Sequence, residues 1–249
     1  MPRYFLEVAY KGTDYSGFQV QKNANSIQAE VEKALHILHK QRIALTGSSR
    51  TDAGVHALQN FFHFDIEDSP APHLIYKMNA ILPDDIAVRR LIDVGPDAHC
   101  RFDALSREYK YFIYRRKDPF LKDRAFYFPY KLNLEAMQEA AALIKENHDF
   151  TSFSKRRTQV KTFICSIMES EWYLETDHLL FYVKADRFLR GMVRALVATM
   201  LKIGRGKIGI HEFKQIIEQK DHGQASFAVP AHGLFLMAVN YPDDYFPKQ

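Results

Sequence analysis

The order of the strand-like and helix-like segments is the feature that most constrains the fold of this chain. Strand-like alternation is found at residues 4–10, 43–45, 61–66, 86–94, 106–116, 162–174, 179–185 and 233–241. Helical spacing of apolar residues is found at residues 27–38, 74–82, 134–144, 191–203 and 213–217. Because the helices do not alternate strictly with the strands, the pattern favours an α+β fold with a largely antiparallel sheet over a doubly wound parallel sheet.

Two of the predicted helices carry start signals. Asn25 is expected to be the N-cap of the first helix, with Gln28 three residues later as in a capping box. Asn133 is expected to cap the helix that begins at residue 134. Residues 96–107 separate two halves that each contain strands and amphipathic helices, and this segment is the predicted junction between them.

Composition places the chain among ordinary intracellular globular proteins. Its 249 residues are enough for one large or two small domains, and its two cysteines do not form a disulfide framework. The first residues do not resemble a signal peptide, and the longest apolar run of the best helix is too short to span a bilayer. We therefore expect a cytoplasmic protein with no membrane partner.

The distribution of charge indicates an anionic partner more clearly than the net charge of +4 does. Six basic residues and no acidic ones lie between Arg187 and Lys207, and four basic residues without an acid lie between Phe150 and Met168. Either cluster alone is typical of a solvated surface. Two such clusters in one half of the chain favour contact with a phosphate backbone.

The segment GSSRTDAGVHALQNF, residues 47–61, contains the most distinctive carboxylate of the chain, Asp52. Asp52 is predicted to lie in a loop between two strands, where a rigid frame can hold a reactive group. An Asp-Ala-Gly sequence is also typical of an ordinary turn, in which Gly54 supplies a positive φ. The residue pattern alone leaves both interpretations open and favours the ordinary turn.

Motifs for cofactors and metals are weak in this sequence. The G-x-G-x-x-G match at residues 204–209 follows a predicted helix, whereas a dinucleotide site requires it after a strand. His211-Glu212 lacks the second histidine of a zinc protease motif, and the remaining histidines and cysteines form no ligand pattern. We therefore expect no cofactor and no metal.

The segment R-T-D-A-G-V-H-A, residues 50–57, closely resembles the signature loop of the TruA-type tRNA pseudouridine synthases. Further blocks resemble that family in the same order along the chain. They are NAILPDDIAV at 79–88, RFDALSREYKYFIY at 101–114, DFTSF at 149–153, FLRGMVRALV at 188–197 and GLFLMAVNYP at 233–242. One departure is Ser49, because the family often has glycine immediately before the arginine.

The resemblance implies a fold and an activity. The fold would consist of two related α+β halves with a largely antiparallel mixed sheet flanked by helices. Residues 1–100 would carry the catalytic loop, and residues 101–249 would complete the active-site cleft. The activity would be isomerisation of uridine to pseudouridine at positions 38, 39 and 40 of the tRNA anticodon stem-loop. It would need no cofactor or metal, and the enzyme would act as a homodimer with tRNA lying across both subunits.

The resemblance also implies roles for four residues. Asp52 would be the catalytic aspartate, attacking either the ribose C1′ or the uracil C6. Arg50 would help to displace the target nucleotide from the helical stack. Tyr109 would stack on the uracil and take part in proton transfer at C5. Arg194 would pair with Asp52 and keep it ionised, which would explain an arginine within an otherwise apolar helical face.

Two other functions remain open at this stage. The first is a tRNA-binding protein of the same fold without catalysis, for which the set of Asp52, Arg50, Tyr109 and Arg194 would be unnecessary. The second is a nucleoside or glycoside hydrolase, a chemistry that usually employs two carboxylates flanking the bond. Release of free nucleobase would distinguish a hydrolase from an isomerase.

Overall fold

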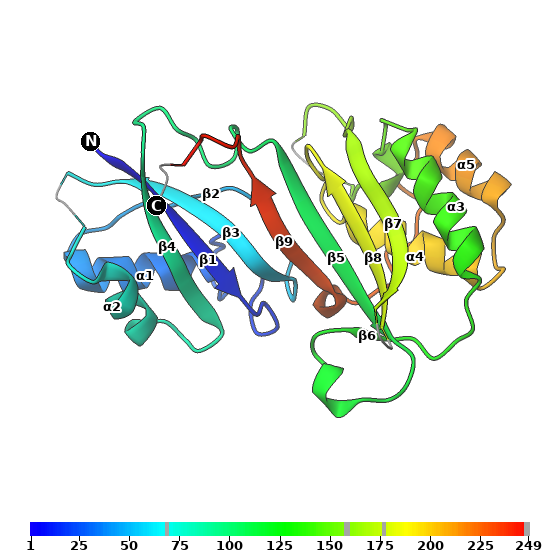
Figure 1. Cartoon of the computed structure of the whole chain (residues 1–249), viewed down its shortest axis with the longest axis horizontal. Coiled ribbons are helices and arrows are strands. Elements are labelled where there is room, and N and C mark those ends of the chain that lie inside the picture. Colours follow the sequence, from blue (N-terminus) through cyan, green and yellow to red (C-terminus); the bar gives the residue numbers. More distant parts are fainter. Residues whose placement is uncertain (68–69, 157–159, 176–177, 247–249) are drawn as a thin grey trace. The chain divides into compact units, whose positions relative to one another are not determined.

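The computed structural model of the chain describes residues 1–67, 70–156, 160–175 and 178–246 (Figure 1). The chain forms two compact units. Unit 1 consists of Met1–Leu105 together with Leu236–Gln249, and unit 2 consists of Ser106–Phe235. Each unit combines antiparallel strands with helices, which confirms the predicted α+β class.

Unit 1 is built on a sheet with the strand order β4-β1-β3-β9. Its strands are β1 (Arg3–Tyr10), β2 (Thr46–Gly47), β3 (His56–Asp65), β4 (Ile86–Val94) and β9 (Leu234–Asn240), of which β9 begins in unit 2. β1 pairs antiparallel with both β3 and β4, and the short β2 pairs with β3. Helices α1 (Ile27–His39) and α2 (Leu74–Ile81) lie next to each other, and α2 contacts β4.

Unit 2 contains the antiparallel strand order β5-β8-β7, with the short β6 parallel to β5. Its strands are β5 (Ser106–Tyr114), β6 (Phe126–Tyr127), β7 (Ile167–Glu175) and β8 (His178–Ala185). Its helices are α3 (Leu134–Lys145), α4 (Met192–Gly204) and α5 (Ile210–Gln219), with 3₁₀ turns at Pro119–Leu121, Thr151–Phe153 and Ala231–Gly233. The α3 helix packs on β7 and on α4.

Helix α4 forms the centre of the unit 2 core. Almost all of its side chains are buried, as expected for a helix that is apolar nearly all round. A side chain at Gly204 would place its Cβ 2.4 Å from the sulfur of Met137 on α3, so the glycine permits the close packing of the two helices. The predicted helix at 191–203 is thus confirmed. None of the helices in the described ranges is long and apolar enough to cross a membrane.

The start of α1 differs from the prediction. Ser26, and not Asn25, is the N-cap, because the Ser26 hydroxyl accepts a hydrogen bond from Ala29 N at 3.3 Å. Gln28 does not complete a capping box. Its side-chain amide instead donates to the carbonyl of Leu45 at 2.9 Å, which ties the helix to the segment that follows it.

Two segments that were predicted as strand are not strand in the structure, because their backbone groups form hydrogen bonds with other parts of the chain. Leu45 donates its N–H to Glu32 of α1, so residues 43–45 pair with helix side chains, and the strand begins only at Thr46. The segment 162–166 pairs with the loop before it, since Cys165 N donates to His148 O at 2.9 Å. Strand β7 therefore begins at Ile167.

His63 gives unit 1 a predictable dependence on pH. Its ring is 7% exposed, and its Nδ1 accepts a hydrogen bond from Cys100 N at 3.3 Å. Burial, with the nearby His99 ring and Arg3 guanidinium, lowers the pKa of His63 to about 4. The unfolded chain, in which histidine titrates near its usual pKa of about 6.5, then binds more protons than the folded chain between those two values.

We therefore expect unit 1 to lose stability as the pH falls from about 6.5 to about 4, with His63 contributing at most ~1.4 kcal/mol per pH unit. Above pH 6.5 this contribution is constant. Urea unfolding midpoints at a series of pH values measure the effect, and His63→Gln should flatten the slope.

Candidate active site

The loop that carries Asp52 is a tight turn between β2 and β3. Val55 N donates to the carbonyl of Asp52 at 3.2 Å, and Gly54 has a φ of +79°, which favours glycine. The Asp52 side chain is half-buried, and the neighbouring Ala53 is exposed. The prediction of an inter-strand loop with a positive φ at Gly54 is confirmed, and the turn presents the carboxylate close to the surface.

A buried hydrogen-bond network fixes the chain immediately before Asp52. Asn60 on β3 is fully buried, and its side chain donates to the Ser49 carbonyl at 2.9 Å and to the Tyr10 hydroxyl at 3.2 Å. Its Oδ1 accepts from the Ser48 hydroxyl at 2.7 Å. The Tyr10 hydroxyl in turn lies 2.8 Å from Oγ1 of Thr51. The residues on either side of Arg50 are thereby tied to β1 and β3.

Burial raises the pKa of Tyr10 to about 12, although its hydrogen bonds to Thr51 and Asn60 act in the opposite direction. The hydroxyl therefore stays protonated and neutral at physiological pH. A neutral network of this kind holds the turn without placing a competing charge beside Asp52. The Asp52 backbone is in this way pre-positioned by uncharged groups.

A second loop, residues 11–18, packs directly against the Asp52 turn. Phe18 N donates to the Thr51 carbonyl at 3.1 Å, and Gly12 N donates to Nδ1 of His56 at 3.0 Å. A Cβ on Gly12 would lie 2.1 Å from the carbonyl oxygen of Val55, and Gly17 has a φ of +120°. Both glycines are therefore required for the close approach of the two loops.

The block NAILPDDIAV supports the same region from β4. Asn79 at the end of α2 donates to the Val88 carbonyl at 2.9 Å and accepts from Val88 N at 2.8 Å, which joins α2 to β4. Asp85 accepts a hydrogen bond of 2.6 Å from the Tyr15 hydroxyl of the 11–18 loop. These residues act as a scaffold for the loop that contacts the Asp52 turn.

Ser49, where the resembling family often has glycine, does not need the freedom of glycine. Its φ is not in the positive range, and the residue is 9% exposed. Its hydroxyl is buried without a hydrogen-bond partner among the residues that the structure describes. The substitution therefore leaves the backbone path of the Arg-Thr-Asp sequence intact and adds one unsatisfied hydroxyl.

Arg50 and Asp52 belong to unit 1, and Tyr109 and Arg194 belong to unit 2. The Arg50 side chain is exposed. Tyr109 lies on β5 and is 7% exposed, with its ring edge-to-face against Phe188 at a centroid distance of 5.0 Å. Phe188 belongs to the segment that precedes α4, so this contact orients the tyrosine relative to the start of that helix.

Arg194 lies in the first turn of α4 and is half-buried. Its guanidinium donates two hydrogen bonds to the Val229 carbonyl, from Nε at 3.0 Å and from Nη2 at 2.7 Å. The Tyr111 hydroxyl donates to the adjacent carbonyl of Pro230 at 2.8 Å. Gly191, the N-cap residue, has a φ of +75°, and this conformation permits the abrupt start of the helix.

Sequence reasoning missed several residues that support these positions. Arg107 at the start of β5 is 9% exposed and donates to the Asp186 carbonyl at 2.9 Å, which anchors the segment that leads to α4. Asn60 was also not identified, and neither was the contact between the 11–18 loop and the Asp52 turn. A charged or amide residue inside a strand-like segment was the available signal, since such a residue is usually paired when buried.

The two predicted basic clusters both lie in unit 2. Lys155 N donates to the Arg190 carbonyl at 3.1 Å, and this bond joins the two segments. Arg157, a member of the first cluster, lies outside the described residues. Among the residues that are described, no group of three or more histidine, cysteine, aspartate or glutamate side chains could hold a metal ion.

The family model for tRNA pseudouridine synthase matches residues 7–103 and 140–242. Asp52, Arg50 and Arg194 lie within the matched ranges, and Tyr109 lies between them. The chain, with its α+β units and the Asp52 turn, belongs to the tRNA pseudouridine synthase family.

Relatives of the same length carry a more specific name, tRNA pseudouridine synthase A. The protein of that name from Parabacteroides distasonis is 46% identical over 100% of both chains. The one from Porphyromonas gingivalis is 46% identical over 99% of this chain and 100% of its own. The one from Exiguobacterium sp. is 41% identical over 97% of this chain and 98% of its own.

Proposed function

We propose that this protein isomerises uridine to pseudouridine at positions 38, 39 and 40 of the tRNA anticodon stem-loop, with Asp52 as the nucleophile. Family membership supports the tRNA substrate and the isomerase activity. The observation that supports the role of Asp52 is the turn itself. A half-buried carboxylate stands on a backbone that a buried, neutral hydrogen-bond network holds in place.

The proposed reaction conserves all atoms. The Asp52 carboxylate attacks the ribose C1′ or the uracil C6, and the N1–C1′ bond breaks. This attack joins an Asp52 oxygen covalently to C1′ or to C6. The uracil then turns within the site, a bond forms between C5 and C1′, and the bond from Asp52 to C1′ or C6 breaks, which regenerates the free carboxylate. C5 loses its proton and N1 gains one, so no oxidant, reductant or energy source is required. A rigidly held nucleophile favours such a step because the reacting atoms must stay aligned while the base turns.

For the other three residues we propose the roles that the resemblance to the family implies. Arg50 is exposed and serves to displace the target nucleotide, a step that costs a few kcal/mol. Tyr109, oriented by Phe188, stacks on the uracil and assists the proton transfer at C5. Arg194 pairs with the catalytic carboxylate and balances its charge in the site. We further propose that the enzyme acts as a homodimer in the cytoplasm, with tRNA lying across both subunits.

The substrate assignment can be tested with unmodified tRNA transcripts that contain uridine at only one of positions 38, 39 and 40. After incubation with the enzyme, a carbodiimide that remains attached to pseudouridine marks the modified position as a stop in primer extension. Stops at these three positions, and none in a transcript with uridines only in the acceptor stem, are expected. Stops that occur only outside the anticodon stem-loop would refute the assignment.

Arg194→Met is expected to reduce both activity and stability. The change removes two hydrogen bonds and leaves the buried Val229 carbonyl without them, at a cost of about 1–3 kcal/mol. Loss of the proposed charge pairing should lower the single-turnover rate about 10²-fold, a typical effect of removing one stabilising group. Rate measurements at saturating enzyme and thermal melting check the two effects. An unchanged rate together with an unchanged melting temperature would show that Arg194 has neither role.

A further inference from the structure

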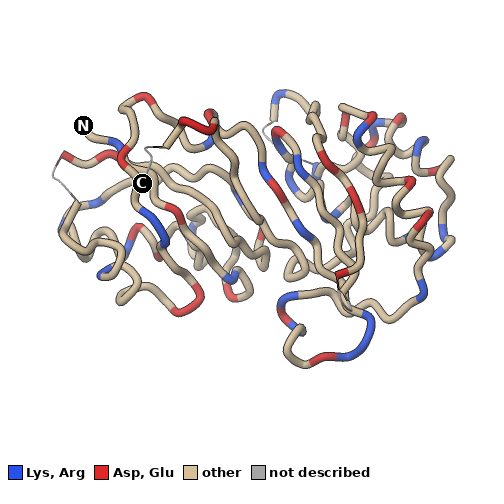
Figure 2. Tube along the Cα trace, in the orientation of Figure 1, with Lys and Arg blue, Asp and Glu red and all other residues tan. Residues whose placement is uncertain are grey.

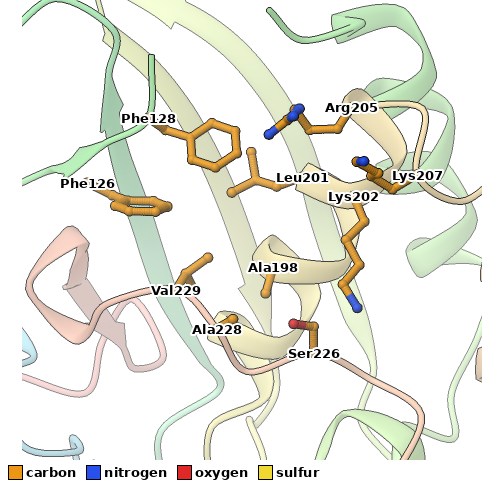
Figure 3. A pocket seen from close by; sticks show the side chains of 10 residues that line it. All are labelled: Phe126, Phe128, Ala198, Leu201, Lys202, Arg205, Lys207, Ser226, Ala228 and Val229. Carbon is orange, nitrogen blue, oxygen red and sulfur yellow. The ribbon is translucent and has the colours of Figure 1, made fainter. Parts of the chain in front are cut away.

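Unit 2 contains a pocket whose lining does not include Asp52, Arg50, Tyr109 or Arg194, although Arg194 donates hydrogen bonds to the carbonyl of its lining residue Val229. It has a volume of about 180 Å³ and lies between the 126–128 segment, the C-terminal half of α4 and residues 226–229 (Figure 3). This exceeds the ~150 Å³ of a cavity that accommodates benzene. The pocket therefore has room for one aromatic ring and is smaller than a typical drug-sized site.

The lining combines apolar walls with a basic rim. In Figure 3, Phe126 and Phe128 lie on one side, Lys202, Arg205 and Lys207 lie on the opposite side, and Leu201 lies between them. Among the residues that the structure describes, neither aspartate nor glutamate lines the pocket. A ligand that is complementary to this lining carries a flat apolar ring next to an anionic group.

The pocket is held in shape by contacts of its walls. The Arg205 guanidinium lies 3.9 Å from the ring centroid of Tyr130, a cation–π contact that orders its side chain. In Figure 3 the Arg205 side chain extends across the pocket toward Phe128. The wall formed by residues 226–229 is tied to α4 by two contacts. The Arg194 guanidinium donates to the Val229 carbonyl, and Ser226 N donates to Oγ1 of Thr199. Because these wall residues are already held in place, they lose little conformational freedom when a ligand binds.

The surroundings of the pocket are also basic and aromatic. The loop that leads to β6 carries five basic residues and two acidic ones, and Figure 2 shows both charges along it. They are Arg115, Arg116, Lys117, Lys122 and Arg124, with Asp118 and Asp123. Exposed aromatic side chains stand among them, including Phe120 at 76% and Tyr130 at 49% exposure. Basic residues interleaved with aromatic ones are typical of surfaces that bind unpaired nucleotides through stacking and phosphate contacts.

We propose that this pocket binds one unpaired nucleotide of the RNA substrate, distinct from the target uridine. The base stacks on Phe128 inside the pocket, and its phosphate contacts the rim cations Arg205 and Lys207. The identity of the RNA as tRNA rests on the proposed function. Phe126 and Phe128 lie between the two ranges that the family model matches. The aromatic side of the pocket is therefore not part of the sequence that defines the family match.

Fluorescence anisotropy with labelled pentauridylate and with an unmodified tRNA transcript tests the proposal. Phe128→Ala should raise the Kd for both RNAs about tenfold, the effect of losing one base–aromatic stack. Tyr127→Ala is the matched control, because Tyr127 is an exposed neighbour that does not line the pocket, and its Kd should stay at the wild-type value. Ala228→Leu fills the exposed edge of the pocket and should weaken binding equally, even if Phe128→Ala impairs folding.

The basic rim is tested by salt dependence. Lys207→Gln should reduce the slope of log affinity against log salt by about 0.7–0.9, as expected for one lost phosphate contact. Lys145→Gln, at an exposed lysine at the end of α3, should leave the slope unchanged. Wild-type RNA affinity in both folded pocket variants would overturn the proposal. A change of oligomeric state without a change of RNA affinity would also overturn it and would indicate a protein contact.

Failure of this proposal is distinguishable from failure of the proposed function. If the pocket variants bind RNA normally while the wild type forms pseudouridine, only the pocket proposal is wrong. If the variants lose affinity while the wild type forms no pseudouridine, only the proposed activity is wrong.

Discussion

Asp52→Asn is expected to lower the single-turnover rate of pseudouridine formation by a factor on the order of 10⁴ or more, the scale of losses when a nucleophile is removed. The amide has almost the same size as the carboxylate but is a far weaker nucleophile. Asp52→Glu restores a carboxylate and displaces it by one methylene, and it should also lose most of the activity, because reacting atoms tolerate little misplacement. Mass spectrometry of nucleosides from a treated tRNA transcript measures both rates.

Asp52→Asn should leave the folding of the protein and its affinity for tRNA nearly intact. The turn depends on backbone groups at Asp52, since its carbonyl accepts from Val55 N, and on the network around Asn60. Asp14→Asn is the matched control, because Asp14 is an exposed carboxylate in the adjoining 11–18 loop. That variant should react at the wild-type rate. Full turnover by folded Asp52→Asn would remove the nucleophile assignment.

Asn60→Leu is expected to destabilise unit 1 by about 3 kcal/mol. The change removes one hydrogen-bond partner from each of four buried groups, namely the Ser48 hydroxyl, the Ser49 carbonyl, the Tyr10 hydroxyl and the N–H of Phe61. For a chain of this length the melting temperature should fall by roughly 6–12 °C. Activity should fall further than stability predicts, because the backbone before Asp52 loses its anchor.

Thermal melting followed by circular dichroism checks the Asn60 prediction. Asn25→Leu serves as the control because Asn25 is exposed and is not the N-cap of α1. Its effect should stay within about 0.5 kcal/mol, as for most surface substitutions. A melting temperature of Asn60→Leu equal to that of Asn25→Leu would show that the network does not stabilise the turn.

The elements that sequence predicted well are those whose signals are local. Helix α4 has its apolar residues within thirteen consecutive positions, and β4 has the same bounds as the predicted strand at 86–94. The wrong assignments depend on contacts between distant residues. Residues 43–45 have a strand-like pattern, but Glu32 and Gln28 of α1 occupy the backbone of Leu45. No pattern within the segment itself reveals that competition.

In the candidate site, too, sequence identified the features with local signals and missed those that depend on distant contacts. Spacing and chemistry identified the Asp52 loop and Gly54, but could not decide between a turn and an active-site loop. The structure shows a well-formed turn, and this turn gives the half-buried Asp52 the rigid support that a reactive carboxylate requires. The roles proposed for Tyr109, Arg50 and Arg194 came from the resemblance to a family. Asn60, Gly12 and Arg107 act through partners far away in the sequence, so no local motif marks them.

The most direct test of the central claim uses an unmodified tRNA transcript labelled with tritium at uracil C5. Conversion of uridine to pseudouridine replaces the C5–H bond by the C5–C1′ bond, so the tritium passes to water while the base stays attached to the RNA. We predict stoichiometric tritium release by the wild type, no free uracil, and no release by Asp52→Asn. Free uracil would indicate a hydrolase, and tight tRNA binding without tritium release by the wild type would contradict an isomerase.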